Sequence, residues 1–264
     1  MHNMEAELDY TRSAQQNAET YFEKAKEAEK KQEGAEQAIK RLEQRMKELE
    51  KEKTTTKELR KKEEREWYEK FYWFLASDGS LAIGGRSAQQ NELINAKHFE
   101  SGDLFFHANI FGASAVVLKG GAAAGKEAKE EAAQFAACFS KAWESGQSAV
   151  DVFSAGRDQV SKSQNRGYLG TGSFLISGER EWYRNVRLEL EACRLRIETA
   201  KGGRDALAVL PEAAFRRLKL EKGVRLVPGD KRKSDAAKRI VQALGAEDID
   251  YVIQHLPPGE FSLK

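Results

Sequence analysis

The chain has 264 residues, of which 40% are hydrophobic and 33% charged, and its net charge at pH 7 is only +2. This balance excludes attraction to nucleic acid through an overall positive field, so any such attraction has to come from local clusters. No apolar run approaches the ~20 residues that span a bilayer, and the N-terminus lacks the pattern of a secretory signal. The two cysteines lack CxxC spacing, and the four histidines lack ligand spacing. We therefore expect a cytoplasmic protein that needs no metal and no cofactor.

Residues 1–66 are predicted to form an antiparallel helical coiled-coil arm. Small and apolar residues recur in alternating steps of four and three, which is typical of a coiled-coil seam. The β-branched residues at 54–56 are predicted to end the first helix. A shorter return helix is expected from Lys57, with Leu59, Trp67, Phe71 and Phe74 on one side. A solvated spacer is the alternative interpretation. The seam consists of Ala14, Ala18, Tyr21, Ala25, Ala28, Gln32, Ala35, Ile39, Leu42, Met46 and Leu49.

Residues 67–185 are predicted to form an α+β domain with a largely antiparallel sheet. Short β-prone runs bounded by glycine turns indicate strands at residues 71–75, 81–83, 104–108, 114–118, 149–153 and 173–176. One inserted helix is expected at residues 126–143. Many strands with a single inserted helix indicate an α+β domain.

Residues 186–264 are predicted to form a small, basic α/β extension. A strand pair is expected at residues 187–198, a loop at Gly202 and Gly203, and a short helix after Pro211. Another strand is expected at residues 224–227. Ser234 is the predicted cap of a helix that ends at Leu244, and the last helix has to stop before the prolines at 257–258.

The sequence contains no convincing catalytic pattern. Residues 120–126 (GGAAAGK) fit the first seven positions of a phosphate-binding loop, but Glu127 stands where Ser or Thr would ligate magnesium. A carboxylate there would repel a nucleotide, so a Gly/Ala turn is the better interpretation. His98 and His107 have no nucleophile elbow nearby. We therefore expect a protein that is not an enzyme.

Two polar loops are predicted to face RNA, because amides and guanidinium groups bond bases and phosphates in several geometries. The first loop follows the glycines at 84–85, and the second covers residues 157–166. Ordinary solvated loops are the alternative, and His107, which lies on an apolar strand, is alternatively a core histidine. The predicted RNA-binding set from these loops and the neighbouring strands is Arg86, Gln89, Gln90, Asn91, His107, Lys119, Arg157, Gln159 and Lys162.

The stretch from Ala200 to Ile240 carries the strongest local charge, with twelve Lys or Arg residues against five Asp or Glu. Lys231, Arg232 and Lys233 come just before a predicted helix N-terminus. Basic groups beside free backbone donors form a phosphate platform, so we add these three residues to the predicted RNA-binding set. A solvated basic face is the alternative.

Motifs across residues 67–180 resemble the NFACT-R domain of the NFACT family. They lie, in order, at residues 67–74, 77–79, 83–86, 89–92, 102–103, 107–108, 112–114, 158–162, 168–169 and 171–174. Leu8-Asp9 with Asn17, Ala18 and Tyr21 resembles the start of that family's middle coiled coil. Residues 256–259 resemble an extension of archaeal members. The large N-terminal domain and helix-hairpin-helix region of the family have no counterpart in this sequence.

The resemblance implies a ribosome-associated quality control factor of the RqcH/NEMF type. Such proteins bind a large ribosomal subunit that holds a stalled peptidyl-tRNA and support addition of a C-terminal tail to the nascent chain. The resemblance thus implies rRNA and tRNA as partners, and a stalk-base protein or quality-control partner for the coiled coil. Asn109, Phe111 and Ser87 depart from the family's usual Asp, His and Asp, which puts a direct RNA role of that set in doubt.

Two other functions stay open. The coiled-coil seam is compatible with a scaffold that recruits a protein partner, which salt-insensitive binding would favour. The polar loops are equally compatible with a general nucleic-acid-binding protein that acts away from the ribosome.

Overall fold

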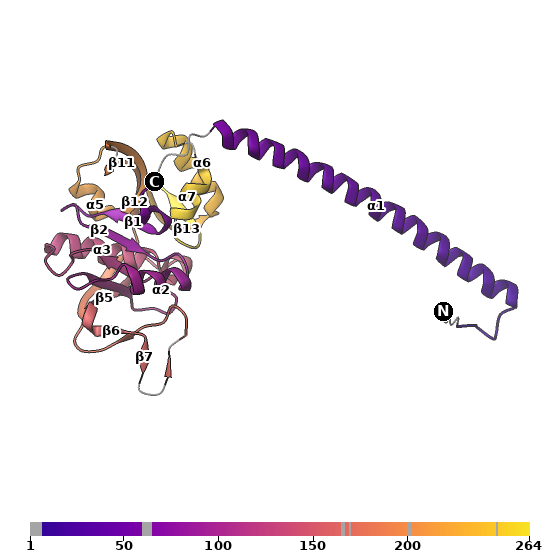
Figure 1. Ribbon diagram of the computed structural model, residues 1–264, viewed down its shortest axis with the longest axis horizontal. Helices are drawn as coiled ribbons and strands as arrows, with labels where there is room; N and C mark the ends of the chain where they lie inside the picture. Colours follow the sequence, from indigo (N-terminus) through magenta and orange to yellow (C-terminus); the bar gives the residue numbers. More distant parts are fainter. Residues whose placement is uncertain (1–6, 60–64, 165–166, 169, 200–201, 247) are drawn as a thin grey trace. The chain divides into compact units, whose positions relative to one another are not determined.

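A computed structural model of the chain describes residues 7–59, 65–164, 167–168, 170–199, 202–246 and 248–264. The chain divides into two compact units, Met1–Glu64 and Arg65–Lys264. The first unit contains the long helix α1, and the second contains two antiparallel sheets with their helices, a mixed α+β arrangement (Figure 1). Within these described ranges no helix is long and apolar enough to cross a membrane.

Helix α1 runs from Ala14 to Leu59. It begins at a capping box, because the Ser13 hydroxyl accepts a hydrogen bond from the Gln16 backbone while the Gln16 side chain accepts one from the Ser13 backbone. The predicted seam residues Ile39, Leu42 and Met46 are exposed along this helix. Their pairing with a second helix stays a prediction.

The predicted turn at residues 54–56 is wrong, because α1 continues through it. Three β-branched residues cost a helix only a few tenths of a kcal/mol each, less than one proline would. The return helix is also wrong in its described part. Trp67–Lys70 form the short 3-10 helix η1, and Tyr72–Leu75 form strand β1. Residues 60–64 of the expected return helix lie outside the described part of the chain.

A six-stranded antiparallel sheet organises the second unit. The predicted strands at 71–75, 81–83, 104–108, 114–118 and 149–153 all lie in it. In sheet order its strands are β1 (Tyr72–Leu75), β2 (Leu81–Gly84), β4 (Val116–Leu118), β3 (Leu104–Ala108), β5 (Ala149–Gly156) and β10 (Glu181–Arg187). After β5 come η2 (Arg157–Gln159), β6 (Val160–Ser161), β7 (Ser163–Gln164), β8 (Gly167–Tyr168) and β9 (Leu175–Ile176). The β6–β9 and β7–β8 pairs form two small ribbons, so the strand expected at 173–176 shrinks to β9.

Three helices accompany this sheet instead of one. Helix α3 (Lys126–Cys138) has Phe139 as its C-cap. Helix α4 (Lys141–Glu144) has Ser140 as its N-cap, whose hydroxyl accepts a hydrogen bond from the Ala142 backbone. The predicted helix at 126–143 is therefore two helices. Helix α2 (Ala88–Lys97), with Ser87 as its N-cap, occupies the stretch that we expected to be a polar loop. The sequence prediction missed this helix because its polar residues resemble a solvated loop. In the structure the side chains of Gln90 and Asn91 form hydrogen bonds within the protein.

A four-stranded antiparallel sheet is formed by the C-terminal residues. Its elements are β11 (Leu190–Thr199), β12 (Gly202–Pro211), α5 (Glu212–Arg217), β13 (Gly223–Lys231), α6 (Lys233–Leu244), α7 (Ile249–His255) and β14 (Phe261–Leu263), with sheet order β12-β11-β13-β14. Residues 190–199 are one strand rather than a pair, and Gly202 and Gly203 begin β12 instead of forming a loop. Arg232, not Ser234, is the N-cap of α6.

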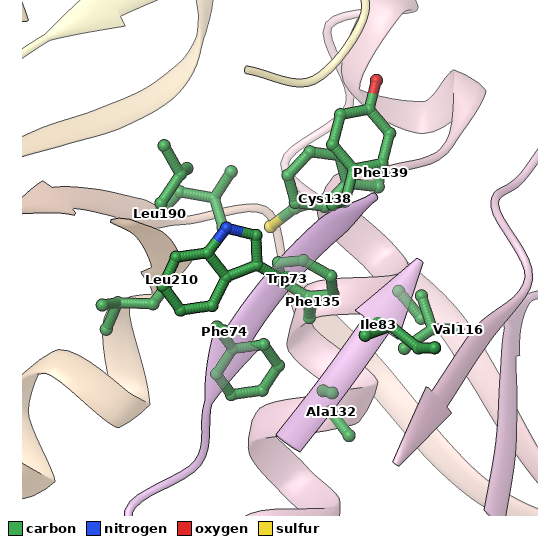
Figure 2. Close-up of a cluster of buried hydrophobic side chains, with 14 of the residues drawn as sticks. Trp73, Phe74, Ile83, Val116, Ala132, Phe135, Cys138, Phe139, Leu190 and Leu210 are labelled. Carbon is green, nitrogen blue, oxygen red and sulfur yellow. The ribbon is translucent and has the colours of Figure 1, made fainter. Parts of the chain in front are cut away.

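Helix α3 joins the two sheets into one core. Phe135 packs on Phe74 of the first sheet at 4.7 Å between ring centroids. Figure 2 shows Leu190 and Leu210 of the second sheet beside Trp73 and Cys138. Both sheets belong to one compact unit. The boundary predicted between residues 185 and 186 falls inside β10 and stays a prediction.

Glu191 on β11 is a buried carboxyl whose pKa is raised from 4.5 to about 7. Burial is the main cause, Arg225 opposes it, and the carboxylates of Glu212 and Glu189 add to it. Between these two pH values the unfolded chain releases this proton before the folded chain does, so folding loses stability as pH rises. Replacing Glu191 with glutamine is expected to raise the melting temperature above pH 7 and to change it little at pH 4.5. Thermal unfolding across this range tests it, with Glu198→Gln, exposed on the same strand, as control.

Candidate nucleic-acid interface

Arg86, the first residue of the predicted RNA-binding set, holds the fold together. Its Nη2 donates to the carbonyls of Glu69 and Phe71 at 2.9 and 2.8 Å, and Nη1 donates to Gln254 Oε1 at 3.2 Å. Burial lowers the pKa of its guanidinium. These contacts join the start of the sheet domain to α7, and they leave an RNA contact of Arg86 a prediction.

His255 completes the same contact. Burial is the largest cause that lowers the pKa of His255 to about 3, followed by the charge of Arg86, so the ring is neutral. The Arg86 guanidinium can only donate, so Nε2 of the neutral ring accepts from Arg86 Nη2 at 2.6 Å. The single ring proton is therefore on Nδ1, which donates to the Tyr251 carbonyl at 2.8 Å. Lys233 lies close by and donates to the Leu256 carbonyl at 2.8 Å. Burial, with the charge of Arg86, lowers the pKa of Lys233 to about 8. The structure therefore brings the two predicted basic clusters together around one buried junction.

The amides of the first polar stretch are also used internally. Gln90 accepts from the Arg86 backbone at 3.0 Å and donates to the Lys70 carbonyl at 3.1 Å. Buried Asn91 accepts from the Ala115 backbone at 3.1 Å. Gln89 is exposed on α2.

Lys119 is held by two carboxylates. Its Nζ lies 2.6 Å from Asp103 and 2.9 Å from Glu100. Burial disfavours the charge, but the hydrogen bonds to both partners outweigh it and raise the pKa of Lys119. Asp103 also accepts from the Gly120 backbone at 2.8 Å, which uses a donor of the Gly/Ala turn that a phosphate would need.

The second polar loop shows the same pattern. Gln159 donates to the Ser177 carbonyl at 3.1 Å and to the Glu179 carbonyl at 2.5 Å. Arg157 donates to the Val160 carbonyl at 3.0 Å. Lys162 pairs with Glu92 of α2 at 2.6 Å, so the structure brings the two predicted stretches together. Residues 165 and 166 of this loop lie outside the described residues.

Two residues of the predicted set, Gln89 and Arg232, are exposed, while Lys231 is half-buried. Most of the others have an internal polar partner. The set as a whole therefore stays a prediction, and the contacts give most of its members a structural role.

An aromatic row crosses the sheet from β3 to β10. His107, Phe153 and Trp182 are register partners on adjacent strands. Their ring centroids lie 5.9 Å apart between His107 and Phe153 and 5.6 Å apart between Phe153 and Trp182. Burial lowers the pKa of His107, which favours its neutral form. Trp182 is 37% exposed and ends the row on β10, the outer strand of this sheet.

Cations surround the exposed end of this row. The Arg184 guanidinium lies 4.3 Å from the Trp182 ring centroid, and that of Arg180 lies 4.7 Å from the Phe153 ring centroid. A hollow of about 480 Å³ opens beside β10, lined by Lys126, Lys129, Glu130, Glu181, Trp182 and Tyr183. We call this region, from His107 to the hollow, the β10 edge. It combines a partly exposed aromatic side chain with basic groups, and aromatic rings beside basic groups are the chemistry that binds single-stranded nucleic acid.

Our sequence interpretation missed Trp182 and its arginines. Arg180, Trp182 and Arg184 stand two residues apart, a period that places them on one side of a strand. The signal was available, but we gave no strand to this stretch and searched for amide-rich loops instead.

Comparison with known proteins gives the family. Residues 70–178 match the NFACT protein RNA binding domain. The archaeal Rqc2 homolog aRqcH of Methanocaldococcus jannaschii is 36% identical over 77% of this chain and 30% of its own length. The NEMF homolog of Drosophila melanogaster, a ribosome quality control complex subunit, is 32% identical over 70% of this chain and 19% of its own. The NEMF of Homo sapiens is 37% identical over 50% of this chain and 12% of its own.

The chain thus spans less than a third of the length of these curated relatives. A solved structure of the C-terminal part of the fibronectin/fibrinogen-binding protein from Streptococcus suis aligns at 27% identity over 49% of each chain, with a TM-score of 0.39. The domain match and the archaeal and animal relatives agree with the resemblance seen in the sequence motifs. This chain is a member of the NFACT family.

Proposed function

We propose that this chain is the RNA- and ribosome-binding part of a cytoplasmic ribosome-associated quality control factor. It binds the large ribosomal subunit with its stalled peptidyl-tRNA and supports tailing of the nascent chain. Similarity of residues 70–178 to an RNA-binding domain, within a chain 36% identical to an archaeal Rqc2 homolog, is the observation that carries the proposal.

The chain acts in this proposal as a binding protein, and peptidyl transfer is left to the ribosome. Most polar groups of the predicted set have hydrogen-bond partners within the chain. Binding and positioning are therefore what we assign to this part of the factor.

Co-sedimentation with large ribosomal subunits, with and without peptidyl-tRNA, tests the proposal. If the chain neutralises two phosphates, the slope of log affinity against log salt is about −1.4 to −1.8, so raising salt from ~50 to ~200 mM is expected to weaken binding about seven- to twelvefold. Salt-independent binding, or no binding at the lower salt, would contradict an RNA-mediated attachment.

A scaffold that recruits a protein partner is the second candidate. The exposed side chains of Ile39, Leu42 and Met46 on α1 favour it, because a seam of this kind is stable against another helix. This candidate would be supported if the affinity for a protein partner does not change with salt concentration and is lost in the Leu42→Lys variant. RNA binding by the same variant should be unchanged.

A further inference from the structure

We propose that the β10 edge binds single-stranded RNA by stacking an unpaired base on Trp182. This inference rests on the proposed RNA-binding function and assigns it a site that the sequence did not predict. Trp182 is the solvent end of the row that Phe153 and His107 continue into the sheet. Base stacking on an exposed aromatic ring needs no particular base, so the site recognises unpaired nucleotides rather than a sequence.

The row fixes the orientation of the exposed ring. Trp182 meets the buried Phe153 at an interplanar angle of 61°, and the β10–β5 pairing holds both residues in register. A ring held by neighbouring rings loses little conformational freedom when a base stacks on it. Rigid aromatic groups therefore make efficient contact surfaces.

Arg184 covers Trp182 in the free protein and also pairs with Asp151 at 2.6 Å. Its side chain is 63% exposed, so both contacts are weak. A base that stacks on the indole displaces a guanidinium held by contacts weaker than the stack that replaces them. The released Arg184 then lies within reach of the RNA backbone.

The hollow beside Trp182 supplies further charge. Lys126, whose side chain is 84% exposed, and Lys129 line it together with Glu130 and Glu181. Glu130 pairs with Arg217 at 2.9 Å, which offsets its repulsion of a phosphate. A volume of about 480 Å³ is large enough for a nucleotide. The indole of Trp182 lies on the face of the sheet that carries Phe153, whereas Tyr183 points to the face covered by α3. An RNA strand that crosses the edge at β10 would place one base on Trp182 and a neighbouring phosphate near the lysines.

A duplex fits this edge poorly. Paired bases are already stacked inside a helix and cannot present a face to Trp182 without being extruded. We therefore expect preference for single-stranded RNA over duplex RNA of the same length. This preference separates the proposal from simple attraction of phosphate to basic residues.

Fluorescence anisotropy of the full chain with a labelled 12-nucleotide poly(U) or poly(A) strand tests the proposal. Trp182→Ala and Trp182→Leu are both expected to weaken binding by about 5- to 150-fold, the range that loss of one base–aromatic stack gives. Trp182→Phe keeps a π-face and is expected to change affinity less than about threefold. Trp67→Ala, which removes a comparably exposed tryptophan outside this edge, is the matched control. Lys126→Gln with Lys129→Gln should flatten the salt slope by about 1.4.

The outcomes are distinguishable. Strong binding by the wild type that survives Trp182→Ala and Trp182→Leu overturns the stacking site and leaves the proposed RNA-binding function intact. The proposed site is also overturned if Trp67→Ala weakens RNA binding as much as Trp182→Ala does, or if the wild type binds duplex RNA more tightly than single-stranded RNA. Absence of any RNA binding by the wild type at low salt overturns the proposed function together with the site. Thermal unfolding of each variant establishes that it is folded.

Discussion

Replacing Glu69 with alanine is expected to lower the free energy of unfolding by about 3–5 kcal/mol, because it leaves buried partners unpaired. The Glu69 side chain is 2% exposed and pairs with Arg204 of β12. It also accepts a hydrogen bond from the Tyr251 hydroxyl at 2.9 Å, and Trp73 Nε1 donates to the same hydroxyl at 3.2 Å. These contacts tie η1 and β1 to β12 and α7. Denaturation in urea measures the loss.

Asp205→Ala is the matched control for Glu69. Asp205 also pairs with an arginine of the second sheet, Arg196, but at 3.9 Å with both side chains more than half exposed. Its removal is expected to cost less than about 0.5 kcal/mol. A cost below about 1 kcal/mol for Glu69→Ala would contradict the claim that this network fastens the C-terminal elements to the first sheet.

Replacing Gly85 with alanine is expected to cost about 3 kcal/mol, at the upper end for overpacking. A Cβ on Gly85 would lie 2.0 Å from Asn91 Oδ1 and 2.7 Å from the Asn91 backbone nitrogen. The side chain of Asn91 could move only by giving up its bond to the Ala115 backbone, and the nitrogen is fixed in α2. Calorimetry or urea denaturation measures the effect.

Gly125→Ala provides the comparison. Gly125 is the N-cap of α3 with an ordinary φ of −64°, and the nearest atom to an added Cβ is the flexible Glu127 carboxylate at 3.4 Å. A change within about 0.5 kcal/mol is expected. Similar effects at both glycines would mean that Gly85 is not required for close approach of α2 to the sheet.

Patterns of local origin predicted much of the fold. Alternating apolar residues and glycine turns located most strands of the first sheet, and the antiparallel α+β arrangement is confirmed. Pro211 and the prolines at 257–258 marked helix boundaries correctly, because proline restricts the backbone whatever surrounds it. Helix α2 was missed since its Ser87 cap looked like part of a polar loop.

The candidate site was harder to predict because the sequence does not show which groups a polar side chain will bond in the folded protein. Arg86, Asn91 and Lys119 have the chemistry to bind RNA, yet in the folded chain they bind carbonyls, an amide and carboxylates from distant segments. Such partners depend on tertiary packing. Trp182 was overlooked because no strand was predicted at residues 181–187, so its place at the edge of the sheet could not be inferred.

Ultraviolet cross-linking of the chain to single-stranded RNA and to large ribosomal subunits, followed by mass spectrometry of the peptides, tests the central claim most directly. Our account predicts nucleotide adducts on the peptide that contains Trp182 in β10, and fewer of them at high salt. Adducts confined to residues 157–164 or 231–239, with none on β10, would contradict it.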